Sequence, residues 1–275
     1  MFRDRLLSGI VLVVIAAAGM YFGGLPLFLG IMIISLIGQM ELYRIMKLNK
    51  SAAGICGYAA TIFYYVMLYF IKDAQNYFLY FAMLLIVALM AVYVFTYPKF
   101  KTQEIMLVFF GVFYVSVMLS FVYLTRKLEH GIWFVWFIFI SSWVSDTFAY
   151  CVGMITGKTI GNHKMSPKLS PKKSIEGAVG GVAGSVIFGC VYGNIIADNL
   201  SGLANPVLAL GLLAGVGALI SMVGDLAASA IKRNFDVKDY GKLIPGHGGI
   251  LDRFDSVIFT APIIYFLAAE ILPKL

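Results

Sequence analysis

Long apolar stretches follow one another along almost the whole chain, and they constrain its fold more than any other feature. A membrane-spanning helix needs about 20 mostly apolar residues. Nine stretches of about this length are present, and they cover residues 6–22, 25–43, 53–71, 77–97, 105–124, 132–152, 175–193, 206–228 and 256–273. The sequence therefore predicts an all-α, polytopic integral membrane protein that forms a single transmembrane domain over residues 1–275.

Composition supports lipid as the main solvent. Hydrophobic residues make up 61% of the 275 residues and charged residues 13%, whereas soluble domains average about 45–50% apolar and about 25% charged. The three cysteines show no CxxC or Cys/His spacing, so neither a disulfide framework nor a zinc site is predicted. The first apolar stretch is not followed by a cleavage site and a soluble domain, and we expect it to be a retained helix.

The positions of lysine and arginine predict the orientation. Cytoplasmic loops of membrane proteins carry an excess of these residues. With a cytoplasmic N-terminus, 17 of the 21 basic residues lie in cytoplasmic segments, and the exceptions are Lys72, Arg126, Lys127 and Lys274. The same bias accounts for the net charge of +7 without nucleic acid as a partner. The two longest loops, near 153–174 and 229–255, then face the cytoplasm.

Five carboxylates lie at or near membrane depth, within about two turns of the predicted cytoplasmic span ends. Such charges are costly in lipid and usually mark function. They are Asp146, Glu176, Asp225, Asp252 and Asp255. Carboxylate oxygens suit a hard cation such as Mg²⁺, whereas the alternative is that each acid pairs with a neighbouring Lys or Arg. Asp225 and Asp252 form the favoured metal pair because they lie at matching depth on consecutive spans, whereas Glu176 fits a helix N-terminus equally well.

Both long cytoplasmic loops contain features that can bind phosphate. Segment 163–174 combines lysines, hydroxyls and prolines directly before a predicted helix, which makes an anion site possible; an ordinary loop at the lipid headgroups is an equally good interpretation. In segment 241–255, glycines around His247 permit close backbone approach to a ligand, or form a plain Gly/Pro turn. The GxxxGKT stretch at 153–159 is one residue short of a nucleotide P-loop and follows a membrane helix, so we reject that motif.

Glycines recur along the seventh apolar stretch. Gly177/Gly181 and Gly180/Gly184 are spaced as small-xxx-small pairs, which permit close helix contact. The spacing does not distinguish contact within one chain from contact between two chains.

The segment from Ser229 to Asp255 resembles the signature of the phosphatidate cytidylyltransferases. Its matching residues are Ser229, Lys232-Arg233, Lys238-Asp239, Pro245-Gly-His247-Gly248-Gly249, Asp252-Arg253 and Asp255, without a break across 27 positions. Stretches 146–150 and 170–177 resemble two further parts of the family, with Ser174 where Thr is more frequent. The resemblance covers most of the chain, although the first five spans match by hydropathy alone.

The resemblance implies an enzyme of phospholipid biosynthesis. It would transfer the cytidylyl group of CTP to phosphatidate, giving CDP-diacylglycerol and pyrophosphate, at the cytoplasmic face of a bacterial inner (plasma) membrane. The family is often homodimeric, with a cavity open to the cytoplasm and to lipid. The resemblance also implies Mg²⁺ at Asp225 and Asp252, a monovalent cation such as K⁺ beside it, and Asp146 and Asp255 as second choices for metal ligands.

On this interpretation, residues 1–130 supply N-terminal spans and residues 131–275 carry the site. Positioning and charge stabilisation would drive the reaction, with His247 as a hydrogen-bonding group rather than a base. The expected catalytic residues are Asp225, Asp252, Lys232, Arg233 and His247. The expected substrate-binding residues are Lys172, Lys173, Ser174, Ser229, Lys238, Asp239, Gly248, Gly249 and Arg253.

Two other functions stay open. A CTP-dependent lipid-alcohol kinase of the polyprenol type would use a similar fold but would transfer the γ-phosphate. A transporter would also place carboxylates at membrane depth, but the paired broken helices typical of transporters are not found in the sequence. The spaced Asp-Gly…Ala-Arg…Asp…Asp pattern of the CDP-alcohol phosphotransferases is absent as well.

Overall fold

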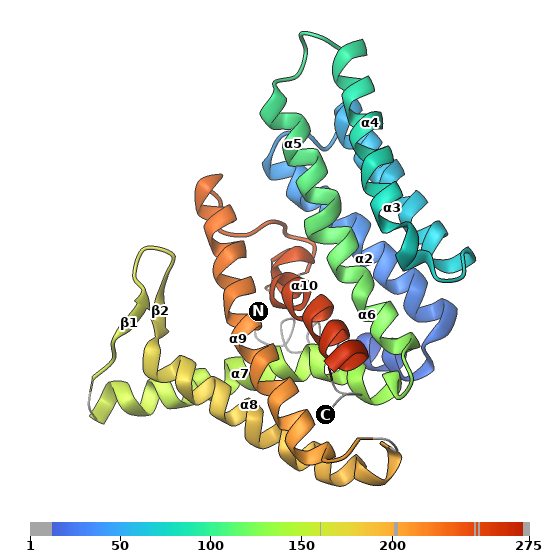
Figure 1. Ribbon diagram of the computed structural model, residues 1–275. Coiled ribbons are helices and arrows are strands. Elements are labelled where there is room, and N and C mark those ends of the chain that lie inside the picture. Colours follow the sequence, from blue (N-terminus) through green and yellow to red (C-terminus); the bar gives the residue numbers. More distant parts are fainter. Residues whose placement is uncertain (1–12, 160, 201–202, 245, 247, 272–275) are drawn as a thin grey trace. The chain divides into compact units, whose positions relative to one another are not determined.

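The protein is largely helical in a computed structural model, which describes residues 13–159, 161–200, 203–244, 246 and 248–271 (Figure 1). The chain divides into two compact units. The first unit comprises Met1–Ser120 and Val237–Arg253, and the second comprises Phe121–Asp236 and Phe254–Leu275.

The first unit is built from helices of the N-terminal part of the chain. They are the short apolar helix Val13–Phe22, α2 (Gly24–Ile45), α3 (Ala52–Phe70), the 3₁₀ turn η1 (Ala74–Tyr77), α4 (Phe78–Phe95), α5 (Thr102–Gly111) and the π-helical turn η2 (Val112–Val117). Local capping explains some of the helix starts. Ser51 accepts a hydrogen bond from the Gly54 amide at 3.0 Å before α3, and the Lys101 amide donates to the Glu104 carboxylate at 2.7 Å before α5.

Polar side chains link α2, α3 and α5 inside the first unit. Thr61 Oγ1 donates to Gln39 Oε1 at 2.8 Å, and Gln39 Nε2 donates to the Tyr43 hydroxyl at 2.8 Å. The Tyr43 hydroxyl in turn donates to the Val108 carbonyl at 2.6 Å. Because these groups are buried, they satisfy one another, and their mutual hydrogen bonds fix how the helices of this unit pack.

The second unit contains four long helical segments and one hairpin. Its elements are α7 (Gly131–Thr159), β1 (Lys164–Ser166), β2 (Ser170–Ser174), α8 (Ile175–Ile196), the 3₁₀ turn η3 (Ala197–Asn199), α9 (Pro206–Asn234), α10 (Leu251–Phe266) and the π-helical turn η4 (Leu267–Ile271). Helix α6 (Met118–Lys127) leads into this unit from the first, and α10 begins at the last residues of the first. The strands β1 and β2 pair antiparallel. Figure 1 shows the resulting hairpin between the end of α7 and the start of α8.

Helix α8 packs along both α7 and α9, and glycine makes the close approach possible. A Cβ added at Gly181 would lie 2.8 Å from the Ser145 carbonyl oxygen of α7, and one at Gly177 would lie 2.7 Å from that of Ala149. A Cβ at Gly189 would lie 2.6 Å from the Leu210 carbonyl of α9. The small residues predicted to mediate close contact therefore do so within one chain.

Seven described helical segments are long and apolar enough to cross a membrane, and they correspond to the second through the eighth predicted spans. The chain is therefore a multi-pass membrane protein. Of the first predicted span, residues 6–12 lie outside the described part, and the helix that follows is shorter. The ninth corresponds to α10 and η4 as far as Ile271. A total of nine spans stays a prediction.

Two predicted loops are shorter than the sequence indicates. Helix α7 continues to Thr159 and helix α9 continues to Asn234. Each helix therefore extends several residues beyond the apolar stretch from which it was predicted. The GxxxGKT stretch lies inside α7, which agrees with its rejection as a phosphate-binding loop. Segment 163–174, predicted as a loop, contains the whole β1–β2 hairpin.

Candidate functional site

A cavity of about 330 Å³ lies in the second unit, between the hairpin and helices α7, α8 and α9. Residues with phosphate-binding and carboxylate chemistry line it together with apolar ones. They include Asp146 of α7, Lys172, Lys173 and Ser174 of β2, Gly177 of α8 and Met222 of α9. Four residues selected from the sequence, Asp146, Lys172, Lys173 and Ser174, therefore share one cavity.

Lys173 connects this cavity to Asp225 of α9. Its ammonium group forms an ion pair with the Asp225 carboxylate. The Lys173 side chain is 25% exposed and the Asp225 side chain is 31% exposed. Asp146 also interacts electrostatically with Lys173 and Asp225. The second unit therefore gathers acids and a cation that are at least 27 residues apart in the chain, where reduced water screening strengthens their interaction.

Asp255 of α10 belongs to the same charged group. It is 8% exposed, and it interacts electrostatically with Asp225 and with Lys232 of α9. Its Oδ1 accepts a hydrogen bond from the Ser256 amide at 2.8 Å. Asp146, Asp225 and Asp255 therefore lie around one region of the second unit, with Lys173 and Lys232 as their cationic neighbours.

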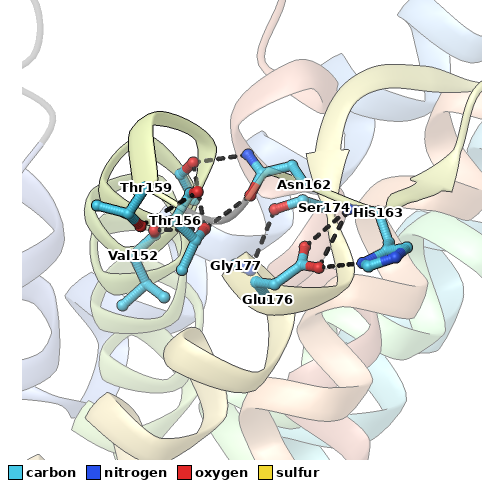
Figure 2. Close-up of polar contacts among 9 residues, drawn as sticks. Val152, Thr156, Thr159, Asn162, His163, Ser174, Glu176 and Gly177 are labelled. Atoms are coloured by element: carbon cyan, nitrogen blue, oxygen red, sulfur yellow. Dashed lines mark hydrogen bonds and ion pairs between the residues drawn. The ribbon is translucent and has the colours of Figure 1, made fainter.

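The base of the hairpin is fixed to the helices on both sides of it (Figure 2). Asn162 Nδ2 donates to the Gly153 carbonyl at 2.7 Å, and Thr156 Oγ1 donates to Asn162 Oδ1 at 2.6 Å. On the other side, the Glu176 carboxylate accepts the His163 amide at 3.1 Å and lies 2.6 Å from His163 Nδ1. Ser174 caps α8 by accepting the Gly177 amide at 3.1 Å. These bonds position β2, and with it the cavity lysines.

Glu176 was an open choice between a functional acid and a helix N-terminal residue. Its contacts with His163 place it as a residue that joins the first turn of α8 to the start of the hairpin. It is not among the residues that line the cavity.

The second group of predicted residues lies in the first unit, on the segment 237–253. Asp252, at the start of α10, is 7% exposed. Its Oδ2 accepts hydrogen bonds from the backbone amides of Tyr240 at 2.8 Å and Gly249 at 3.0 Å. Gly248 has a φ of +83°, and a Cβ there would lie 2.9 Å from the same oxygen. The loop therefore wraps around the Asp252 carboxylate, and position 248 requires glycine.

Sequence reasoning missed Glu41, which lies near the end of α2 and is 3% exposed. Its carboxylate accepts the amides of Ile250 at 3.1 Å and Leu251 at 2.9 Å. The signal was present in the sequence, because Glu41 is a carboxylate inside the predicted span 25–43 and stands three residues before Arg44. Its partners could not be read from the sequence because more than 200 residues separate them.

The remaining predicted site residues have less enclosed positions. Ser229 and Lys232 are half-buried on α9, whereas the exposed residues are Arg233, Lys238, Asp239 and Arg253. His247 lies outside the described residues, so its predicted role stays a prediction. Asp225 belongs to the second unit and Asp252 to the first, and their pairing as metal ligands likewise stays a prediction.

The carboxylates have the donor chemistry that a hard divalent cation needs. Mg²⁺ is commonly held by one or two protein carboxylates together with water and substrate phosphates. Among the described residues no group of three or more His, Cys, Asp or Glu side chains is arranged as a complete metal site. Asp225 in the second unit and Asp252 in the first are each carboxylates of the kind that can bind such a cation together with substrate phosphates.

Comparison with known proteins agrees with the resemblance seen in the sequence. The model of the cytidylyltransferase family matches residues 3–270. A phosphatidate cytidylyltransferase of Bacillus subtilis is 28% identical over 276 residues, which cover 97% of each chain. Phosphatidate cytidylyltransferases of Staphylococcus saprophyticus and Staphylococcus aureus are 31% and 30% identical, over 63% and 62% of this chain and 62% of their own. Because the family match spans nearly the whole sequence, the chain belongs to the cytidylyltransferase family.

Proposed function

We propose that this protein transfers the cytidylyl group of CTP to phosphatidate, giving CDP-diacylglycerol and pyrophosphate. The observation that carries the proposal is the cavity of the second unit, where Lys172 and Lys173 of β2 stand beside Asp146 of the apolar helix α7. Such a cavity supplies cations for phosphate oxygens next to acids that suit a metal ion. The full-length relative from Bacillus subtilis, which bears the name phosphatidate cytidylyltransferase, supports the same reaction.

The protein's contribution to this reaction is positioning and electrostatics. A phosphate oxygen of phosphatidate attacks the α-phosphorus of CTP, the bond from that phosphorus to the bridging oxygen of the β-phosphate breaks, and pyrophosphate leaves. The ammonium groups of Lys172 and Lys173 would bind phosphate oxygens as point charges. Lys232, Arg233 and Lys238 are further candidates for phosphate binding. The reaction needs no general base, because the phosphate monoester is already largely ionised near neutral pH.

Asp225 and Asp252 would hold Mg²⁺, with Asp146 and Asp255 as second choices and with a monovalent cation such as K⁺ nearby. When bound, Mg²⁺ neutralises charge on the attacking and leaving oxygens. The backbone bonds to Asp252 Oδ2 hold this carboxylate in one orientation. The ion pair with Lys173 likewise restrains the orientation of the Asp225 carboxylate.

The membrane setting matches the two substrates. The acyl chains of phosphatidate stay in lipid while CTP arrives from water. We further propose that the N-terminus and the β1–β2 hairpin face the cytoplasm, that the membrane is the inner (plasma) membrane, and that the protein is a homodimer. The bias of basic residues supports the orientation.

The reaction is tested with the purified full-length protein in lipid nanodiscs that contain phosphatidate. Mg²⁺ is added together with CTP labelled at either the α- or the γ-phosphorus. We expect label in the lipid product only from the α position, and release of pyrophosphate that depends on Mg²⁺. Label in lipid from the γ position alone would instead identify a lipid kinase and refute the proposed reaction.

A further inference from the structure

We infer that Glu41 is a positioning residue, which holds the loop that carries Asp252 in its working conformation. Glu41 lies on α2, far in sequence from the signature segment 229–255, and neither composition nor motif assigns it a role. The inference concerns only the first unit. It rests on the proposed function in one respect, namely that Asp252 is a metal ligand.

Four backbone amides of one short segment point at two carboxylates. The Tyr240 and Gly249 amides donate to Asp252, whereas the Ile250 and Leu251 amides donate to Glu41. Hydrogen bonds between amides and ionised carboxylates are stronger than those between neutral groups. In the described part of this loop, two amides therefore bind Glu41 and two others bind Asp252, so each carboxylate restrains different backbone groups.

The loop also fits closely around Glu41. A Cβ at Gly241 or at Gly249 would collide with the Glu41 carboxylate oxygens. These glycines therefore make room for a side chain of α2, in addition to any role toward a ligand. The presence of Gly249 in the family signature thus has an internal structural reason in this chain.

Helix α2 makes two further contacts with the same segment. The Arg44 guanidinium donates to the Tyr240 carbonyl at 2.8 Å. Leu251 is fully buried, and its side chain packs against Gly38 of α2. A Cβ added at Gly38 would lie 3.5 Å from Leu251 Cδ1. Positions 38, 41 and 44 are spaced by three residues and lie on one face of α2. This face binds the loop through its amides, one carbonyl and one apolar side chain.

The consequence is that loss of Glu41 should loosen Asp252 without removing it. Removing the carboxylate leaves two buried amides without their acceptor, which favours opening of the loop. Residues that orient a metal ligand typically affect metal affinity or activity by about 10- to 100-fold. We expect Glu41→Ala to lower kcat by that factor and to raise the Mg²⁺ concentration for half-maximal activity. Glu41→Gln, which keeps one acceptor oxygen, should fall between Glu41→Ala and the unaltered protein.

The decisive experiment is amide hydrogen exchange on the full chain in detergent, without substrate or metal. In Glu41→Ala, the amides of segment 249–252 should exchange at least about tenfold faster than in the unaltered protein. Gln39→Ala is the matched control, because Gln39 is a fully buried polar residue of the same helix whose side-chain bonds go to Tyr43 and Thr61. It should leave exchange of this segment within about twofold of the unaltered protein.

Two results would overturn the inference: unchanged exchange in Glu41→Ala, or equal acceleration in Gln39→Ala. The second result would mean that any damage to α2 loosens the loop. The metal role of Asp252 is tested separately. An active Asp252→Asn variant would refute that role, whereas the exchange result for Glu41 would still stand.

Discussion

At the scale of single residues, the acids of this chain are held by two different kinds of partner. Asp252 and Glu41 accept hydrogen bonds from backbone amides of one loop. Asp225 instead forms an ion pair with the Lys173 ammonium. Amides restrain a carboxylate without neutralising it, while an ammonium group neutralises it directly. Substitutions at the two places should therefore have different consequences.

Lys173→Met should abolish most activity, because it removes an ammonium group that both pairs with Asp225 and lines the cavity. Loss of a charge-stabilising donor in an active site typically costs a factor of about 10²–10³ in turnover. Lys158→Met is the control, since Lys158 is exposed at the end of α7 and is not a cavity residue. Steady-state rates of CDP-lipid formation by both variants test this, and comparable rates in the two variants would exclude Lys173 from the site.

Asp252→Asn separates chemistry from loop structure. Asparagine keeps one oxygen that can accept the Tyr240 and Gly249 amides, so we expect the variant to insert and to remain folded. It loses the negative charge that a divalent cation requires, so Mg²⁺-dependent turnover should fall by at least about 100-fold. Activity should be titrated against Mg²⁺ in Asp252→Asn and in Asp225→Asn. Near-normal turnover in both would refute the metal assignment.

At the scale of elements, the hairpin depends on its attachment at Asn162. Asn162→Ala removes the bonds to Gly153 and Thr156 (Figure 2) and should let β2 move relative to α7. We expect faster proteolysis within 160–174 and a KM for CTP several-fold higher, since two cavity lysines lie on β2. Thr159→Val is the control, because within the described residues the Thr159 hydroxyl bonds only to backbone carbonyls of its own helix. If proteolysis of Asn162→Ala matches that of Thr159→Val, the attachment is dispensable.

Contact between α7 and α8 depends on Gly181, whose space is limited by the Ser145 carbonyl and the Met222 side chain. Backbone cannot move aside as a flexible side chain can, so Gly181→Val should destabilise the protein by about 1–3 kcal/mol, as overpacking typically does. Ala183→Val adds a larger side chain on an exposed position of the same helix and should be nearly neutral. Unfolding of both variants in detergent measures the difference, which should vanish if α7 and α8 are not tightly packed.

At the scale of the whole molecule, hydropathy was sufficient to place most spans, because each must match the thickness of the membrane. The acids Asp146 and Asp225 could be selected for the same reason, since charge in lipid is costly. The conformation of segment 163–174 could not be predicted, because the bonds that fix its base, from Asn162 to Gly153 and from His163 to Glu176, join residues outside any local pattern. Glu41 was missed in the same way, since only the folded chain brings it to Leu251.

The orientation of the chain can be tested independently of its first span. Three apolar helical segments, α4, α5 to α6, and α7, separate Lys72 from Lys168. If all three cross the membrane, these two positions lie on opposite sides, and the bias of basic residues places Lys168 inside. In a chain whose three native cysteines are changed to alanine, Lys168→Cys should react with a membrane-impermeant maleimide only in inverted vesicles. Lys72→Cys should react only in intact spheroplasts. Labelling of both variants from the same side would mean that an even number of these segments crosses the membrane, and the hairpin would then lose its assigned cytoplasmic position.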